Sequence, residues 1–197
     1  MQTEPVQLLQ ESATVHPDWL VRFMLREQSQ QLALESNVNA AVLIPVWLSA
    51  DGWQVLLTKR ALHLRHHPGQ ISFPGGRLEA GETALTAAMR EAQEEVGIDA
   101  AEIRWTGQLP ALSTSTGFVV KPYLAMLNSA PCLQIQVDEV AEVLIVPLDY
   151  LLNPAHRTTE TWLLRNQLQE LHFIPWQQHL IWGASAAILA SLQRQIG

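Results

Sequence analysis

Three glutamates follow an arginine at helical spacing near the middle of the chain: Glu91, Glu94 and Glu95 come after Arg90. With about 3.6 residues per turn, Glu94 and Glu95 lie about 60° and 40° to either side of Glu91, so all three carboxylates are expected on one helix face. Like charges at this spacing weaken an isolated helix, and the cluster calls for a counter-ion. Because all-oxygen ligands favour Mg²⁺ or Mn²⁺ over zinc, the spacing predicts a site for a hard divalent ion.

The helix that would carry these glutamates has recognisable ends. Thr83 suits the N-cap position and Gly97 suits the position after the last helical residue, which predicts a helix over roughly residues 83–96. An apolar stripe about 100° round from the carboxylates predicts its buried face. The stripe comprises Leu85, Ala88, Met89, Ala92 and Val96.

The run from Gly76 to Ile98 has a spacing that can be compared with known families. It reads GRLEAGETALTAAMREAQEEVGI and fits Gly-x5-Glu-x7-Arg-Glu-U-x-Glu-Glu-x-Gly-U, where U is aliphatic. It resembles the signature of the Nudix hydrolases, metal-dependent enzymes that cut a nucleoside diphosphate linked to another group. Ala92 stands where a larger aliphatic residue is usual, which affects packing more than chemistry. The matched positions are Gly76, Glu82, Arg90, Glu91, Glu94, Glu95 and Gly97.

The resemblance implies a role for each matched side chain. Arg90 would orient Glu91 and take part in catalysis, and Glu82 would support the ligands without touching the ion. Mg²⁺ or Mn²⁺ would be the cofactor. The implied metal ligands are Glu91, Glu94, Glu95 and the Gly75 carbonyl.

A second motif lies directly upstream of the first. Residues 56–76 read LLTKRALHLRHHPGQISFPGG and resemble the additional motif of the coenzyme A pyrophosphatase branch of the Nudix family. The segments 109–127 and 181–183 also look like that branch, so the resemblance covers about residues 38–190. It implies hydrolysis of coenzyme A to 3′,5′-ADP and 4′-phosphopantetheine, with acyl or oxidised forms as further candidate substrates.

Coenzyme A carries a 3′-phosphate beside its diphosphate, and the chain has a net charge of −7, so fixed cations are needed to bind it. Arg60 and Arg65 in the upstream motif suit this role because arginine can hold phosphate in a bidentate fork. Together with Gly76 they are the expected substrate-binding residues. The alternative is that both arginines are ordinary surface residues.

Hydrolysis also needs a water activated near the ions and a carboxylate base to take its proton. Nudix enzymes differ over whether a helix glutamate or a later one serves. The two candidates here are Glu91 and Glu139, with Glu142 a weaker choice. Asp138, Glu139 and Glu142 could equally form a solvated stretch before a strand.

Two other functions remain open. A Nudix enzyme for ADP-ribose, a nucleotide sugar or an oxidised nucleotide is disfavoured by the upstream motif. A non-catalytic module that senses a nucleotide or RNA is disfavoured by the complete glutamate set, and a sequence pI of about 5.4 gives no electrostatic footprint for nucleic acid. A zinc site at His63, His66 and His67 lacks a second ligand cluster.

The composition fits one globular domain spanning residues 1–197, with 48% hydrophobic and 16% charged residues. We find no basic segment followed by an apolar run at the start, and no apolar stretch of membrane-spanning length. The single cysteine, Cys132, excludes an intramolecular disulfide. We therefore expect a cytoplasmic protein with a small-molecule substrate and no membrane partner, and a homodimer stays open.

Strands interrupted by a few helices predict an α/β fold, an α/β/α sandwich with a mixed sheet, which the family resemblance also implies. A hairpin turning at residues 51–52 is expected to join the first two strands. The expected strands are residues 39–48, 53–58, 103–109, 119–127, 133–137, 143–146, 161–164 and 170–174. The expected helices, besides residues 83–96, are residues 18–31, 148–152 and 179–193.

Overall fold

A mixed β-sheet of eight strands forms the centre of the computed structural model, which describes residues 18–26, 36–164 and 167–197. Its strands are β1 (Ala40–Ser49), β2 (Gly52–Arg60), β3 (Ile71–Ser72), β4 (Gly75–Arg77), β5 (Ile103–Gln108), β6 (Leu112–Ser113), β7 (Val119–Leu127) and β8 (Val140–Pro147). The main order is β3-β2-β1-β7-β5, while β4 pairs with β1, β6 with β7 and β8 with β2. The pairing of β1 with β7 is parallel and the other pairs are antiparallel, so the predicted mixed sheet is confirmed.

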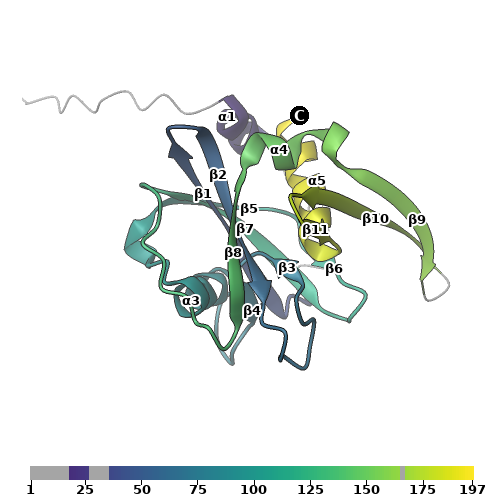
Figure 1. Ribbon diagram of the computed structural model, residues 1–197, viewed down its shortest axis with the longest axis horizontal. Helices are drawn as coiled ribbons and strands as arrows, with labels where there is room; N and C mark the ends of the chain where they lie inside the picture. The colour runs from purple at the N-terminus through teal and green to yellow at the C-terminus, as the bar shows by residue number, and fades with distance from the viewer. Residues whose placement is uncertain (1–17, 27–35, 165–166) are drawn as a thin grey trace, which may run out of the picture.

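A smaller antiparallel sheet and four α-helices surround this centre (Figure 1). The small sheet contains β9 (Thr158–Leu164), β10 (Gln167–Trp176) and β11 (His179–Trp182). The α-helices within the described residues are α1 (Asp18–Leu25), α3 (Ala84–Val96), α4 (Leu148–Leu152) and α5 (Ala184–Ile196). Two short 3-10 helices, η1 (Ala100–Glu102) and η2 (Pro154–His156), complete the elements.

The large sheet is covered on both faces because its strands alternate buried side chains between two cores. On β1, Ala41 and Leu43 pack in the core that α3 covers with Ala88 and Ala92. The next residues in the alternation, including Ile44, belong to the opposite core, which also contains residues of α1, α4, α5 and the small sheet. This arrangement confirms the predicted α/β/α sandwich. The single-domain organisation stays a prediction, which the core shared by both sheets supports.

Most predicted elements are found close to their expected bounds. The hairpin of β1 and β2 turns at residues 50–51, with Ser49 paired to Gly52. Helix α3 has Thr83 as its N-cap, whose hydroxyl accepts a hydrogen bond from the Thr86 N–H, and Gly97 ends it in the left-handed conformation. The predicted strand over residues 119–127 and the short helix over residues 148–152 match β7 and α4.

Two predicted elements are wrong. Residues 133–137 form no strand, because the N–H groups of Gln134 and Gln136 donate to the Val96 and Glu95 carbonyls at the end of α3. The predicted helix over residues 179–193 is instead a strand followed by a helix. β11 pairs with β10, and Gly183, with φ of 65°, lets the chain turn into α5.

The predicted N-terminal helix over residues 18–31 is confirmed only in part. Helix α1 ends at Leu25, and residues 27–31 lie outside the described part of the chain. Leu20 and Phe23 of α1 are buried, whereas Met24 is 54% exposed.

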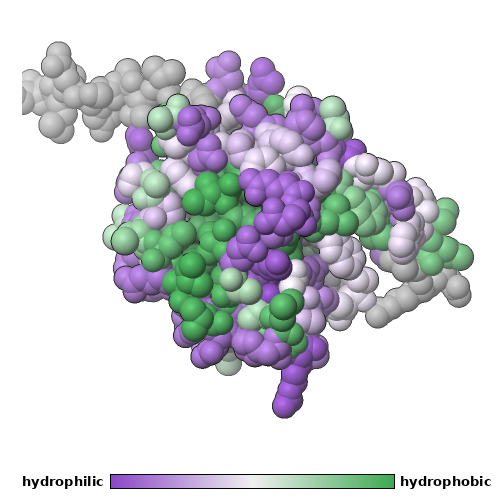
Figure 2. Space-filling view, viewed as in Figure 1, coloured by the Kyte–Doolittle hydropathy of each residue, from purple (hydrophilic) through white to green (hydrophobic). Residues whose placement is uncertain are grey.

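Among the exposed large apolar side chains of the described residues, two groups lie near β8 and on the β9–β10 hairpin. Figure 2 shows hydrophobic residues over β8 and the segment before it, where Ile135, Val137 and Ile145 are exposed. Leu163 and Leu168 are exposed on the strands of the β9–β10 hairpin. None of the described helices is long and apolar enough to cross a membrane.

Candidate active site

The glycine pair of β4 brings the backbone against the glutamates of α3. β4 pairs with β1, with Val42 opposite Gly75. A Cβ on Gly75 would lie 2.3 Å from the Ala41 carbonyl oxygen, and one on Gly76 would lie 2.3 Å from Glu91 Oε1. Neither position has room for a side chain. Gly76 therefore lies against Glu91. It can contact a substrate only through its backbone atoms.

Arg90 connects several acceptors on one guanidinium group. Its Nε donates to Glu82 Oε1 at 3.0 Å, and its Nη1 donates to Glu91 Oε1 and Glu94 Oε2, each at 3.0 Å. Its Nη2 donates to the Arg77 carbonyl oxygen at 3.2 Å and to Glu82 Oε2 at 3.2 Å. The hydrogen bond to Glu82 is the main reason that the pKa of Arg90 is raised and the pKa of Glu82 is lowered. The Arg90 guanidinium thus holds the carboxylates of Glu91 and Glu94 through one nitrogen, Nη1.

Glu95 differs from the other helix glutamates because it is buried. Its side chain is 4% exposed, against 61% for Glu94, so the three carboxylates of this helix differ in their access to solvent. Glu95 Oε1 lies 3.9 Å from Arg60 Nη1, while its Oε2 is buried without a hydrogen-bond partner. Burial, followed by the charge of Glu91, raises the pKa of Glu95 to about 8.

The residues of this site fit a divalent cation by their chemistry. Within residues 18–26, 36–164 and 167–197, no three His, Cys, Asp or Glu side chains come together as a ready metal site, the three loop histidines included. Glu91 and Glu94 are instead turned to Arg90. However, the donors are all oxygens, and Glu95 keeps one buried oxygen that nothing satisfies. A hard cation would satisfy that oxygen and offset the repulsion between Glu91 and Glu95.

The two later glutamates considered as bases have different surroundings. Glu139 is exposed; burial is the main reason that the pKa of Glu91 and of Glu95 is raised, and the charge of Glu139 adds to both shifts. Its backbone carbonyl accepts a hydrogen bond from the Ala61 N–H at 2.8 Å. Glu142 is paired with Lys59 Nζ at 3.4 Å and with a histidine ring nitrogen at 3.1 Å. The fold brings Glu139 to the helix glutamates and commits Glu142 to other partners.

The arginines of the upstream motif lie on one closed loop. The Arg60 N–H donates to the Gln70 carbonyl at 3.0 Å, and the Gly69 N–H donates to the Arg60 carbonyl at 3.1 Å. These hydrogen bonds hold the two ends of the loop together at the junction of β2 and β3. Arg60 thereby reaches Glu95, and Arg65 is exposed on the loop.

Two partners of the site were missed from the sequence. The Arg77 carbonyl receives a hydrogen bond from Arg90, and a backbone acceptor leaves no side-chain signal. His179 Nε2 lies 3.1 Å from Glu142 Oε1. His179 was expected in a helix, whereas it lies in the strand β11. The contact with Glu142 could have been predicted only if this strand had been recognised.

A model of the NUDIX domain matches residues 38–180 of this chain. The chain belongs to the Nudix family. Among relatives of this Nudix protein are two uncharacterized Nudix hydrolases called NudL. The one from Photorhabdus laumondii is 35% identical over 181 residues, covering 91% of this chain and 96% of the relative. The one from Enterobacter sp. (strain 638) is 36% identical over 182 residues, covering 91% and 94%.

A solved structure shows the same fold. A MutT/nudix family protein from Enterococcus faecalis has a TM-score of 0.53 at 18% identity, covering 90% of this chain and 68% of that chain. Membership in the family supports an enzyme that acts on phosphorus-containing anhydrides. Nudix hydrolases generally need divalent metal ions, typically Mg²⁺ or Mn²⁺, which agrees with the oxygen donors of this Nudix protein.

Gly76→Ala is expected to lower kcat by roughly a hundredfold, because a catalytic group displaced by about 1 Å can cost that much. The new Cβ would collide with the end of the Glu91 side chain, which can move away without unfolding the protein. Steady-state kinetics measures kcat, and thermal melting shows whether the variant stays folded. Gly81→Ala is the matched control, since a Cβ there meets no atom within 4 Å although φ is 82°. Normal kcat in Gly76→Ala would contradict the proposed role of Glu91.

Glu95→Gln is expected to change how the stability of the metal-free protein depends on pH. The pKa of Glu95 is about 8 in the folded protein against an ordinary value of 4.5, so the unfolded chain loses this proton first as pH rises. The free energy of unfolding then falls by up to about 1.4 kcal/mol per pH unit between these two values and levels off above the higher one. Glutamine removes this contribution. Denaturant unfolding in chelator at several pH values measures the free energy of unfolding of both proteins. If this free energy depends on pH in the same way in the variant and the wild type, the raised pKa of Glu95 is contradicted.

Proposed function

We propose that this protein hydrolyses the diphosphate bond of coenzyme A, giving 3′,5′-ADP and 4′-phosphopantetheine. The observation that carries the proposal is the loop of residues 61–68 with its flanking residues, which bears the sequence motif of the coenzyme A branch and sets Arg60 beside Glu95. A cation at this position can bind a phosphate of the substrate, and coenzyme A has one phosphate more than 3′-dephospho-coenzyme A, ADP-ribose or NADH.

The metal would be held by Glu91, Glu94, Glu95 and the Gly75 carbonyl. A divalent ion bound there would lower the pKa of a water molecule and neutralise charge on the diphosphate. Arg90 fixes the direction of two of these glutamates, and Glu82 keeps Arg90 in place through two hydrogen bonds. Mg²⁺ and Mn²⁺ are the proposed cofactors because every donor is an oxygen.

Glu139 is the proposed base, with Glu91 as the alternative. The water oxygen forms a bond to one phosphorus of the diphosphate, and the bond from that phosphorus to the bridging oxygen breaks. The electron pair leaves with the other phosphate, and the proton of the water passes to the base. Glu139 suits this step because it is exposed and its charge acts on Glu91 and Glu95. Glu142 is less suited because Lys59 and His179 already occupy its carboxylate.

Glu139→Gln is expected to lower kcat for coenzyme A by about 10²- to 10⁴-fold with little change in KM, because general base catalysis is lost while shape is kept. Steady-state kinetics across pH measures the loss. Glu142→Gln is the matched control and should retain kcat. A normal kcat in Glu139→Gln would assign the base to Glu91 instead.

A substrate panel tests the specificity. The values of kcat/KM with Mg²⁺ are compared for coenzyme A, 3′-dephospho-coenzyme A, ADP-ribose and NADH. We expect coenzyme A to be preferred by at least about tenfold, the effect of one charge-assisted phosphate contact. A preference for another diphosphate would retain the Nudix assignment and contradict the coenzyme A one. Tight binding without turnover of any compound would indicate a binding module.

A further inference from the structure

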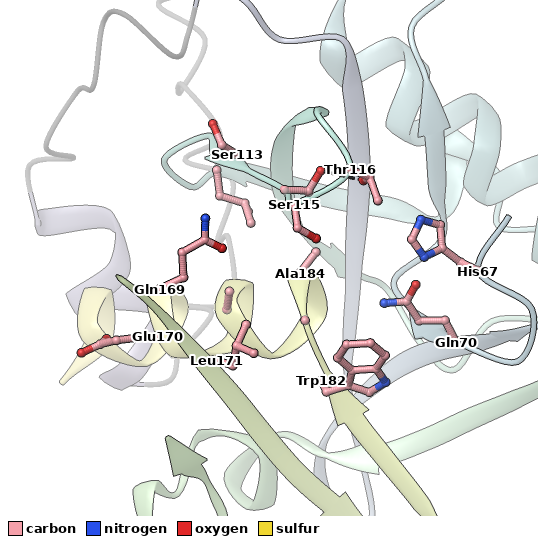
Figure 3. A pocket seen from close by; sticks show the side chains of 14 residues that line it. His67, Gln70, Ser113, Ser115, Thr116, Gln169, Glu170, Leu171, Trp182 and Ala184 are labelled. Atoms are coloured by element: carbon pink, nitrogen blue, oxygen red, sulfur yellow. Dashed lines mark hydrogen bonds between the residues drawn. The ribbon is translucent and has the colours of Figure 1, made fainter. Parts of the chain in front are cut away.

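A cavity of about 220 Å³ lies beside the end of the loop that follows Arg60 and carries Arg65. Three separate parts of the chain enclose it: the end of this loop at His67 and Gln70, the segment around β6, and the layer formed by β10, β11 and α5 (Figure 3). The helix glutamates and Glu139 do not line it. The cavity is therefore a separate space from the carboxylate site.

The walls of this cavity are held together by specific contacts. Ser185 Oγ at the start of α5 donates to the Ile71 carbonyl of β3 at 3.0 Å, and both residues are buried. A Cβ on Gly183 would lie 3.4 Å from Gln70 Nε2, so the Gln70 amide lies close to the start of α5. His67 adopts the left-handed conformation with φ of 53°, which is uncommon for a residue other than glycine, and its carbonyl accepts from the Gln70 N–H. The cavity is thus built from fixed elements.

The lining has one formally charged group and is mixed in polarity. It contains no lysine or arginine, and Glu170 is its only carboxylate. Figure 3 shows the hydroxyl side chains of Ser113, Ser115 and Thr116 on one wall and the Trp182 ring near the start of α5. Apolar carbon is supplied by residues such as Ala187. Hydroxyl, amide and imidazole groups can donate and accept hydrogen bonds to amides, whereas a lining without cations and with one carboxylate disfavours a phosphate.

The distance to the carboxylate site fits a substrate that spans both places. Gly75 lies five positions after Gln70, so their Cα atoms lie within roughly 18 Å of each other. Gly75 and Gly76 in turn lie against the site of the helix glutamates. A diphosphate at the glutamates could therefore extend a long linear group over the loop into the cavity.

We infer that this cavity binds the pantetheine arm of the substrate, an uncharged chain with two amides, a hydroxyl and two methyl groups. The inference rests on the proposed function. It assigns the two halves of coenzyme A to different places: the adenosine 3′-phosphate to the arginines, and the arm to the cavity without cations. The mixture of hydrogen-bonding groups and apolar carbon in the lining matches the alternation of amides and methylenes along the arm.

The test uses the two products as competitive inhibitors of coenzyme A hydrolysis. Ala187→Phe fills the cavity from α5, and Ser115→Phe fills it from the opposite wall. We expect the inhibition constant of 4′-phosphopantetheine to rise by at least about tenfold in both variants, while that of 3′,5′-ADP stays within about twofold. Ser191→Phe, one turn further along the same side of α5 and outside the lining, is the matched control and should change neither constant.

Each outcome has a distinct meaning. Retained inhibition by 3′,5′-ADP shows that the variants are folded and that the carboxylate site is intact. An unchanged inhibition constant for 4′-phosphopantetheine in both cavity variants would overturn the assignment of the cavity alone. Weaker inhibition by 3′,5′-ADP instead would overturn it by placing the adenosine end in the cavity. Absence of coenzyme A hydrolysis by the wild-type protein would overturn the proposed function and this inference together.

Discussion

Glu94→Gln and Glu95→Gln are each expected to lower turnover of coenzyme A by roughly a thousandfold while the fold is kept. Both substitutions remove a ligand charge and preserve the shape of the side chain. Glu95 is the stronger case, because its buried Oε2 has no hydrogen-bond partner among the described residues and a metal ion would satisfy it. The measurement is kcat with Mg²⁺, together with circular dichroism to confirm that the variants are folded.

Glu160→Gln provides the control for these substitutions. It removes one carboxylate on β9, where the carboxylate accepts a hydrogen bond from the Trp162 ring, and glutamine can still accept that bond. Its turnover should equal that of the wild type. Normal turnover in either Glu94→Gln or Glu95→Gln would contradict the proposed metal site.

Arg65→Ala is expected to raise KM for coenzyme A by about 10- to 100-fold and to leave KM for 3′-dephospho-coenzyme A nearly unchanged. Arg65 is exposed, and within the described part of the chain we find no ion pair of its side chain that the substitution would break. Arg60→Ala should also raise KM selectively for coenzyme A. In addition it should lower kcat for both substrates, because the Arg60 guanidinium lies beside Glu95 and lowers the pKa of that carboxyl.

The pair of substrates is the control within this experiment, since they differ only in the 3′-phosphate. Arg104→Ala is a second control, since Arg104 is an exposed arginine on β5, outside the upstream motif. Equal increases in KM for both substrates would mean that neither Arg60 nor Arg65 contacts the 3′-phosphate.

Helix α3 could be predicted almost completely because its determinants are local. Thr83 and Gly97 mark its ends through their own backbone and side-chain chemistry, and the spacing of Ala88 and Ala92 gives its buried face. The burial of Glu95 could not be predicted in the same way. It depends on Arg60 and Gly75, which reach the helix only through the pairing of distant strands.

The errors in secondary structure have a common physical origin. Residues 133–137 have the apolar alternation of a strand, yet their N–H groups satisfy the carbonyls at the end of α3. Residues 179–182 continue the apolar pattern of α5, but pairing with β10 makes them a strand. In both cases hydrogen bonds override the apolar pattern: those of residues 133–137 are tertiary, and those of residues 179–182 come from the β10–β11 hairpin, in which Trp176 pairs with His179.

The site shows the same division between local and tertiary information. Arg90, Glu91 and Glu94 are neighbours on one helix, so their association follows from spacing alone. The approach of Glu139 to these residues and the cavity behind the Arg65 loop need strands and loops that are far apart in sequence. A single sequence gives no periodicity that reports such contacts.

The most direct test of the account is to incubate the wild-type protein with coenzyme A and Mg²⁺ and to resolve the products by chromatography. We expect 3′,5′-ADP and 4′-phosphopantetheine in equal amounts, at a rate that falls to background in excess chelator and in Glu95→Gln. Intact coenzyme A under these conditions, with Mg²⁺ or Mn²⁺ and with turnover of another diphosphate in the same assay, would contradict the proposed function.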